Sequence, residues 1–353
     1  MPLREISFTS VVRRGTLFVL YCLTAGLVVS LFVFRPGINW YERATFPDMV
    51  YGTAHRPYVY RALVPTIIRS IAAVTPSGIK DAVRSSGEGT RVIRRLGWEP
   101  QFLFEYAVAV VLFFCMLVGL AFVLRKLVLR VYSFPPFVAD MMPIIGLIVL
   151  PVFFRYYSHI YDPVTLFLSS LALLFLVTER KLFFYLIFVL STINKETSVL
   201  LIGLFIMKEY SGMVKGKLLL HAFSLSLLWI FIKGGINFIF RNNPGEIVEF
   251  HFDHTMNLFR DFPSFAYLIA VTFGLGSLTF FGWKEKPLFL RQGVAMTLLP
   301  LALLAIFLGS VDETRGYYEA FPYVFMLIVP TIVTVFDMDR NPANYSQELP
   351  LPK

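Results

Sequence analysis

The sequence predicts an all-α fold, a polytopic bundle of transmembrane helices in a single integral-membrane domain over residues 1–340. Hydrophobic residues make up 57% of the 353-residue chain and charged residues only 16%, whereas a soluble domain carries about 25% charged residues. Apolar stretches of about 20 residues recur, which is the length that crosses a bilayer. The Lys and Arg residues that give the net charge of +9 lie mostly beside these stretches, where they set topology and meet anionic lipid.

About eight full spans and one half-length hairpin are expected. The spans are placed at 16–34, 102–124, 136–154, 160–178, 218–240, 265–281, 293–309 and 321–336. The first span is expected to remain as an uncleaved anchor, because it is long for a signal peptide and lacks an A-x-A site. Cys22 and Cys115 both fall within spans, so no disulfide framework is predicted.

Residues 182–207 contain two apolar runs interrupted by Asn194-Lys195-Glu196. They form either one long span with charges near its middle or a hairpin of two half-length helices. With a cytoplasmic N-terminus, the hairpin concentrates Lys and Arg in the cytoplasmic segments, as the positive-inside rule requires. A single span would place the basic stretch from Lys208 to Lys217 outside, so the hairpin is preferred. Both termini are then cytoplasmic, and the Pro-rich tail 341–353 is expected to be disordered.

The long first loop, 35–101, is extracytoplasmic in this topology and too long for a plain connection. Its segment from Arg56 to Val74 is apolar with spaced arginines, which predicts an amphipathic helix in the membrane interface that is kinked at Pro65. The stretch from Ser77 to Thr90 is small and polar and is expected to be loop.

Charged residues, histidines and tyrosines from distant segments are expected to meet on the extracytoplasmic face. An acid there can act as a general base, and cationic or polar side chains can hold an anionic substrate. The candidate catalytic residues are Asp48, Asp162 and Glu196. The candidate residues for binding substrate and lipid phosphate are Arg56, Tyr60, Arg61, Arg155, His159, Asn194, Lys195 and Arg315.

Several of these residues also have a purely structural interpretation. Arg56 and Arg61 can extend to lipid headgroups instead of a substrate phosphate. Asp162 can cap the helix that follows it. Lys195 and Glu196 can form an internal ion pair, although charges in a membrane favour a functional role.

His251, Asp253 and His254 are considered as metal ligands because of their residue types, but a metal site normally needs support from more distant residues. No Walker A, G-x-S-x-G, H-E-x-x-H or CxxC motif is present. No cofactor is therefore predicted, while binding of a divalent cation remains an alternative. Nucleic acid is not expected as a partner, because no nucleic-acid-binding motif is present.

Four short motifs resemble a broad group of bacterial polytopic proteins that are similar to the C-type (GT-C) glycosyltransferases. The motifs are Arg56-Pro-Tyr-Val-Tyr-Arg61-Ala-Leu-Val-Pro65, Tyr161-Asp162-Pro163, Asn194-Lys195-Glu196-Thr197 and Glu313-Thr-Arg315. The resemblance implies an acid in the first outer loop, a position that Asp48 matches, and basic residues that hold a polyprenyl phosphate. The family's usual acidic pair in this loop is not evident, because Glu42 and Asp48 are well separated.

The resemblance predicts a membrane glycosyltransferase that transfers a sugar from a polyprenyl-phosphate donor to a glycan or other cell-envelope acceptor. Membrane lipid, the donor and the acceptor are then the partners. Two alternatives remain. Broken helices are typical of transport sites, which allows a transporter or flippase of a lipid-linked or anionic solute. The interfacial helices also allow a non-catalytic subunit of a membrane complex.

Overall fold

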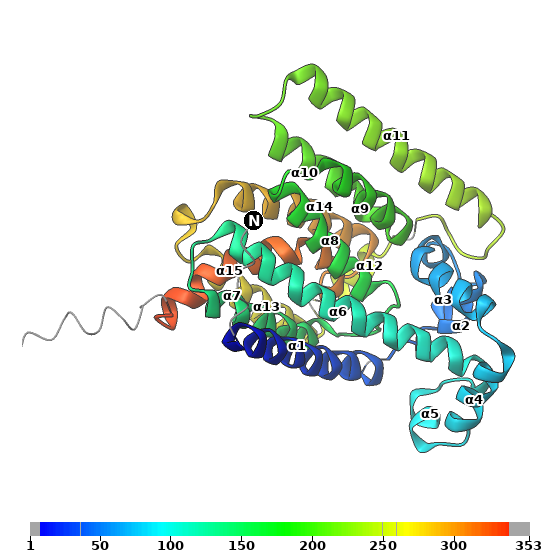
Figure 1. The fold of residues 1–353 in the computed structure, drawn as a ribbon. Coiled ribbons are helices and arrows are strands. Elements are labelled where there is room, and N and C mark those ends of the chain that lie inside the picture. Colours follow the sequence, from blue (N-terminus) through cyan, green and yellow to red (C-terminus); the bar gives the residue numbers. More distant parts are fainter. Residues whose placement is uncertain (1–7, 36, 249, 259, 339–353) are drawn as a thin grey trace, which may run out of the picture.

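The computed structural model describes residues 8–35, 37–248, 250–258 and 260–338 (Figure 1). Every regular element in these ranges is a helix, so the all-α prediction is confirmed. Within them, seven helices are long and apolar enough to cross a membrane, which indicates an integral membrane protein. They are α1 (Phe8–Phe34), α6 (Leu103–Val131), α7 (Pro136–Val149) with η4 (Leu150–Phe153), α11 (Lys215–Ile239), α13 (Phe262–Phe280), α14 (Leu288–Leu308), and η7 (Thr314–Ala320) with α15 (Phe321–Val335).

The remaining expected span, 160–178, is the shorter helix α8 (Asp162–Val177). Its 16 residues extend about 24 Å, which is less than the roughly 30 Å of a hydrocarbon core. Most of α8 is buried, and it packs against α6, α9 and α15. The polar residues at its start are thus held inside the bundle.

Residues 182–207 form two short helices, α9 (Lys181–Asn194) and α10 (Leu200–Glu209), joined by the turn η5 (Glu196–Val199). Helix α9 ends because Lys195 adopts an extended backbone, with φ −156° and ψ 144°.

The start of α9 and the end of α10, which are the ends far from the turn, lie close together. Lys181 Nζ is 2.5 Å from Glu209 Oε2, and the ring centroids of Phe184 and Phe205 are 5.4 Å apart. The segment therefore turns back and leaves at the end of the bundle where it enters. Helix α11 packs along both arms at the edge of the molecule (Figure 1).

The first loop contains four helices, α2 (Phe46–Tyr51), α3 (Leu63–Val74), α4 (Ser77–Gly87) and α5 (Arg91–Leu96). Helix α3 begins only at Leu63, so Pro65 lies in its first turn, where the N–H that proline lacks would have no partner within the helix and no earlier turn is present to be kinked.

The prediction of a loop from Ser77 to Thr90 is wrong, because most of this stretch is α4. Helix α4 packs against the start of α6, with Gly87 against Leu103, so tertiary packing outweighs the weak local propensity. The tail 341–353 lies outside the described residues.

Several helices approach one another closely at glycines. A Cβ at Gly119 of α6 would lie 2.8 Å from the ring of Phe167 in α8, and one at Gly146 of α7 would lie 2.8 Å from the ring of Phe325 in α15. A Cβ at Gly293 of α14 would overlap the ring of Tyr323 in α15. Small residues permit such close packing between membrane helices.

We expect Gly293→Ala to reduce the free energy of unfolding by about 1–3 kcal/mol, because the added methyl group overpacks the contact with the buried Tyr323 ring. Denaturant titration in mild micelles measures this loss. The matched control is Gly276→Ala in α13, where a new Cβ meets nothing within 4 Å. Equal stabilities of the two variants would show that the close approach of α14 and α15 is unimportant.

Candidate functional site

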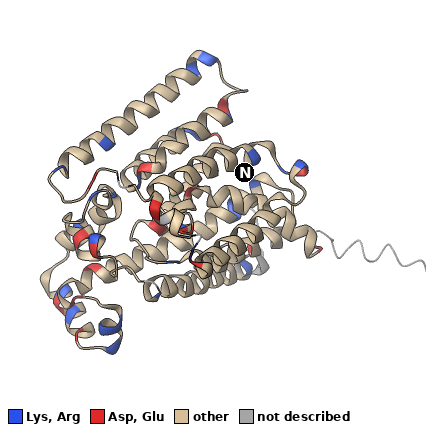
Figure 2. Cartoon of the chain, turned by 180° about the vertical axis from the view of Figure 1, so that it is seen from behind, with Lys and Arg blue, Asp and Glu red and all other residues tan. Residues whose placement is uncertain are grey.

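Charged residues are sparse along most helices and gather mainly at helix ends and connections (Figure 2). One group lies where α8, the hairpin turn, α11 and η7 meet the start of α3. We call it the charged cluster. It contains four cations and four anions, which are Arg61, Lys195, Lys233 and Arg315 with Asp162, Glu196, Glu313 and Glu319.

The Arg61–Glu196 pair lies at the tip of the hairpin. Arg61 Nη2 is 2.8 Å from Glu196 Oε1, and its guanidinium carbon lies 4.4 Å from the ring centroid of Tyr161, whose hydroxyl it also contacts. The Trp229 indole of α11 donates a hydrogen bond of 3.1 Å to the Glu196 carbonyl. The Arg61 side chain is 12% exposed and the Glu196 side chain 41%. Glu196 is therefore a carboxylate that a ligand can reach, on a turn that is held in place.

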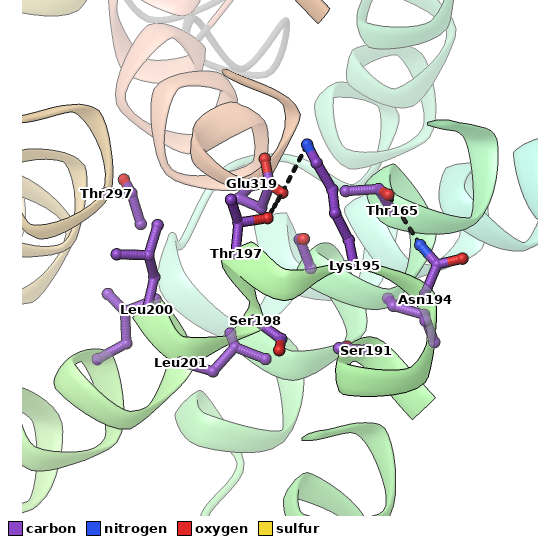
Figure 3. Close-up of a pocket in the computed structure, with 13 residues that line it drawn as sticks. Thr165, Ser191, Asn194, Lys195, Thr197, Ser198, Leu200, Leu201, Thr297 and Glu319 are labelled. Atoms are coloured by element: carbon purple, nitrogen blue, oxygen red, sulfur yellow. Dashed lines mark hydrogen bonds and ion pairs between the residues drawn. The ribbon is translucent and has the colours of Figure 1, made fainter. Parts of the chain in front are cut away.

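The Lys195–Glu319 pair joins the hairpin to η7. Lys195 Nζ is 2.9 Å from Glu319 Oε1, and the Thr197 hydroxyl donates to the same oxygen (Figure 3). The two charged side chains are 11% and 9% exposed. A buried pair of this kind requires both partners, because either charge alone would remain uncompensated.

Arg315 is held between two carboxylates. Its guanidinium bonds Glu313 and lies 3.7 Å from Asp162, whose side chain is 3% exposed. Asp162 Oδ2 also accepts a hydrogen bond of 3.1 Å from the backbone N–H of His159. Asp162 thus fixes the turn before α8 rather than capping the first turn of that helix.

Aromatic side chains form a wall beside the charged cluster. The ring of His159 stacks on Tyr161, with centroids 5.2 Å apart, and lies 5.5 Å from Tyr58. Tyr41 lies 5.0 Å from Tyr58 and 4.8 Å from Tyr157. These five rings, the aromatic wall, combine apolar faces with polar edges, which suits a ligand that carries both apolar and hydroxyl surfaces.

Burial, with the nearby charges of Arg315, Arg61 and Lys195, holds the pKa of His159 well below its ordinary value. The imidazole is therefore neutral at physiological pH. A neutral ring does not add to the positive charge of the cluster.

A cavity of about 20 Å³ lies behind the hairpin turn (Figure 3). Hydroxyl, amide, ammonium and carboxylate groups line its polar part, which contains Thr165, Ser169, Ser191, Asn194, Lys195, Thr197, Ser198, Thr297 and Glu319. Among the described residues, Ser191 Oγ, Asn194 Oδ1 and Glu319 Oε2 find no hydrogen-bond partner, and a space of this size holds one water molecule. Asn194 is kept in place by its amide group, which donates to Thr165 Oγ1 at 2.9 Å.

Six predicted site residues contribute to this region, whereas others have separate environments. The six are Arg61, His159, Asp162, Lys195, Glu196 and Arg315, with Asn194 directly behind them. Asp48 instead accepts hydrogen bonds of 2.5 Å and 2.7 Å from Thr45 and Thr53, within the first loop. Arg56 donates to the Gly245 carbonyl.

Tyr60 and Arg155 lie at the borders of the charged cluster. Tyr60 is buried and takes part through its carbonyl, which lies 3.4 Å from Lys233 Nζ. Arg155 pairs with Asp312 at 3.4 Å, and its guanidinium covers the Tyr267 ring at 4.3 Å. Arg155 thus belongs to a neighbouring ion pair.

The proposed metal ligands lie elsewhere. Among the described residues, no group of three or more His, Cys, Asp or Glu side chains is placed to hold a metal ion. Asp253 is exposed on the short helix α12 (Phe252–Leu258), next to His251, and the side chain of His254 is not among those described.

Sequence reasoning did not include Tyr161, Lys233, Glu313 and Glu319 among the candidate site residues. A signal for Lys233 was available, because a lysine within an apolar span is itself a sign of a site. Glu313 is a local partner of Arg315, two residues away in the Glu313-Thr-Arg315 motif, whereas the pairing of Glu319 with Lys195 follows only from the packing of η7 near the hairpin.

The fold and its apolar helices define an integral membrane protein. Comparisons with models of protein families, with curated proteins and with solved structures found no match to the chain. The candidate site therefore rests on its own geometry.

We expect Lys195→Met to lower the free energy of unfolding by about 3–5 kcal/mol, because it leaves Glu319 buried without its counter-ion. The double variant Lys195→Met/Glu319→Gln is expected to recover most of this loss. Denaturant titration of both single variants and the double variant completes a double-mutant cycle. Additive losses would show that the two side chains are not coupled.

The neutral His159 predicts a pH dependence of stability. Below the unfolded-state pKa of about 6.5, the unfolded chain binds a proton that the folded chain does not, so stability falls by about 1.4 kcal/mol per pH unit. Above that pH the contribution of His159 is constant. Unfolding measured between about pH 5 and 6 is expected to show this slope, and His159→Phe, which retains the stacked ring, is expected to reduce it. An unchanged slope in the variant would assign it to other groups.

Proposed function

We propose that this protein is a membrane glycosyltransferase resembling the C-type enzymes. It transfers a sugar from a polyprenyl-phosphate donor to a cell-envelope acceptor at the extracytoplasmic face of a bacterial inner membrane. The observation that carries the proposal is Glu196, a carboxylate exposed at the hairpin tip between Arg61 and Lys233 and beside the aromatic wall. A base, cations for the leaving phosphate and a surface for a sugar are the groups that this reaction needs.

The proposed topology has eight spans, with α8 as the short one, and a hairpin that turns back within the membrane. The N-terminus and the C-terminus are then cytoplasmic, and the charged cluster faces the outside. Two features support this arrangement. The Lys181–Glu209 contact brings the ends of the hairpin together, and the basic stretch from Lys208 to Lys217 then lies inside.

The donor phosphate binds Arg61 and Lys233 in this proposal. Lys233 is 5% exposed, and within the described part of the chain its ammonium makes a single long hydrogen bond, to the Tyr60 carbonyl, so it keeps donors for a ligand. The phosphate competes with Glu196 for Arg61, since both are anions that suit the guanidinium fork. Binding of the donor thereby releases the Glu196 carboxylate.

The released Glu196 acts as the general base. It takes the proton of the acceptor hydroxyl while that oxygen attacks the anomeric carbon of the sugar. The bond from this carbon to the phosphate oxygen breaks, and the electron pair stays on the lipid phosphate. Arg61 and Lys233 stabilise the new charge. Asp48, the other candidate base, is assigned to the structure of the first loop, because Thr45 and Thr53 occupy its oxygens.

A transporter or flippase is the second candidate function. The polar cavity behind the hairpin turn favours it, because broken helices with unpartnered polar groups are typical of transport sites. A transporter must open this region to both sides of the membrane, whereas the enzyme needs access only from the outside and from the lipid.

We expect Arg61→Gln and Lys233→Met each to weaken the binding of undecaprenyl phosphate by about tenfold or more, because each removes a charge-assisted hydrogen bond. Glu196→Gln is expected to bind at least as tightly as the wild type, because it removes the competing anion, and to lose sugar transfer. Binding is measured by native mass spectrometry, and transfer as release of undecaprenyl phosphate from a panel of undecaprenyl-phosphate monosaccharides.

Asp48→Asn serves as the matched carboxylate control and is expected to leave binding and transfer unchanged. Transfer by Glu196→Gln at the wild-type rate would remove Glu196 as the base, and loss of transfer in Asp48→Asn would return that role to Asp48. Labelling of a Glu196→Cys variant by a membrane-impermeant reagent from both sides of the membrane would favour the transporter.

A further inference from the structure

A second group of charges lies at the other end of the bundle, where α1, α6 and α7 meet around Asp140. Asp140 is 4% exposed. Arg13 bonds its Oδ2 atom through two guanidinium nitrogens, with Nε at 2.8 Å, and Arg125 Nε lies 2.7 Å from Oδ1. The Tyr21 hydroxyl donates to the Asp140 carbonyl at 2.9 Å and fixes the backbone of α7.

This group has more positive charge than the carboxylate neutralises. Two guanidinium groups share one carboxylate, which leaves a net charge of about +1. The Arg13 side chain is 48% exposed and the Arg125 side chain 32%. An arginine has five N–H donors, and Asp140 uses two from Arg13 and one from Arg125. Most donors therefore remain available to an external anion.

An exposed apolar surface lies on the same two helices as the two arginines. Phe18 is five residues after Arg13 on α1, Phe122 is three residues before Arg125 on α6, and the two rings stack with centroids 6.5 Å apart. They are 52% and 43% exposed. A ligand with an anionic head and an apolar tail matches this arrangement of positive charge beside apolar surface, whereas free phosphate matches only the charge.

We propose that Arg13 and Arg125 bind the phosphodiester headgroup of an anionic lipid, with an acyl chain against Phe18 and Phe122. Asp140 holds both guanidinium groups in place before the lipid arrives, so little side-chain entropy is lost on binding. Guanidinium forks suit phosphate oxygens, and basic pockets between membrane helices bind anionic headgroups. The site is separate from the charged cluster and does not depend on the proposed enzymatic activity.

The test measures lipid binding by native mass spectrometry of the full chain in micelles, with phosphatidylglycerol and phosphatidylcholine as probes. The wild type is expected to retain phosphatidylglycerol preferentially. The double variant R13Q/R125Q is expected to bind phosphatidylglycerol about twenty-five-fold more weakly, since each arginine contributes about a factor of five. Phe18→Ala is expected to weaken binding of the lipid as well.

The matched control is R14Q/K126Q, which removes the same charge from the neighbouring exposed residues on α1 and α6. It is expected to lose much less affinity, and an equal loss in the two double variants would overturn the proposal in favour of general surface charge. Since R13Q/R125Q leaves Asp140 unpaired, R13Q/R125Q/D140N is measured beside it. Wild-type-like binding by the triple variant would overturn the site.

Inorganic phosphate distinguishes a lipid from a free anion. Thermal unfolding of the wild type is expected to shift upward with phosphatidylglycerol and not with inorganic phosphate at matched ionic strength. An equal shift with both would assign the arginines to a soluble phosphate compound and overturn the lipid site.

Discussion

A charge inside an apolar bundle must have a partner, and this requirement organises the molecule at both ends. At one end, the pairs Arg61–Glu196 and Lys195–Glu319 connect the first loop, the hairpin and η7. At the other end, Asp140 connects three helices through two arginines. Chain segments that are far apart in sequence are thereby brought together by electrostatics, while apolar packing and glycine contacts fill the space between.

Much of the fold could be predicted because it depends on local properties. Apolar length places the spans, and the excess of Lys and Arg on one side indicates that residues 182–207 turn back. Helix α4 escaped prediction because its sequence is a weak helix former and its packing against α6 decides the conformation. The short helix α8 shows the same limit, since its length alone does not reveal how deeply Asp162 is buried.

Part of the candidate site could also be predicted from local properties of the sequence. Arg61, Lys195 and Glu196 are conspicuous because charges are rare in such a chain. Their counter-ions depend on tertiary structure, so Glu319 could not be assigned to Lys195 from the sequence. For Asp48 the sequence did not show the local hydrogen bonds from Thr45 and Thr53, and its role as a base stays a prediction.

The connection from Lys195 and Thr197 to Glu319 has a mechanical consequence. It fastens the tip of the hairpin to the segment that leads into α15, so the tip and the last helix must move as one rigid body. Helix α11, by contrast, contacts the tip through the Trp229 indole, which donates to the Glu196 carbonyl, and contacts the first loop through Lys233, which donates to the Tyr60 carbonyl. Moving α11 away would break single hydrogen bonds to backbone carbonyls, whereas moving η7 and α15 away would break the buried Lys195–Glu319 pair, so α11 is the easier side of the hairpin to displace.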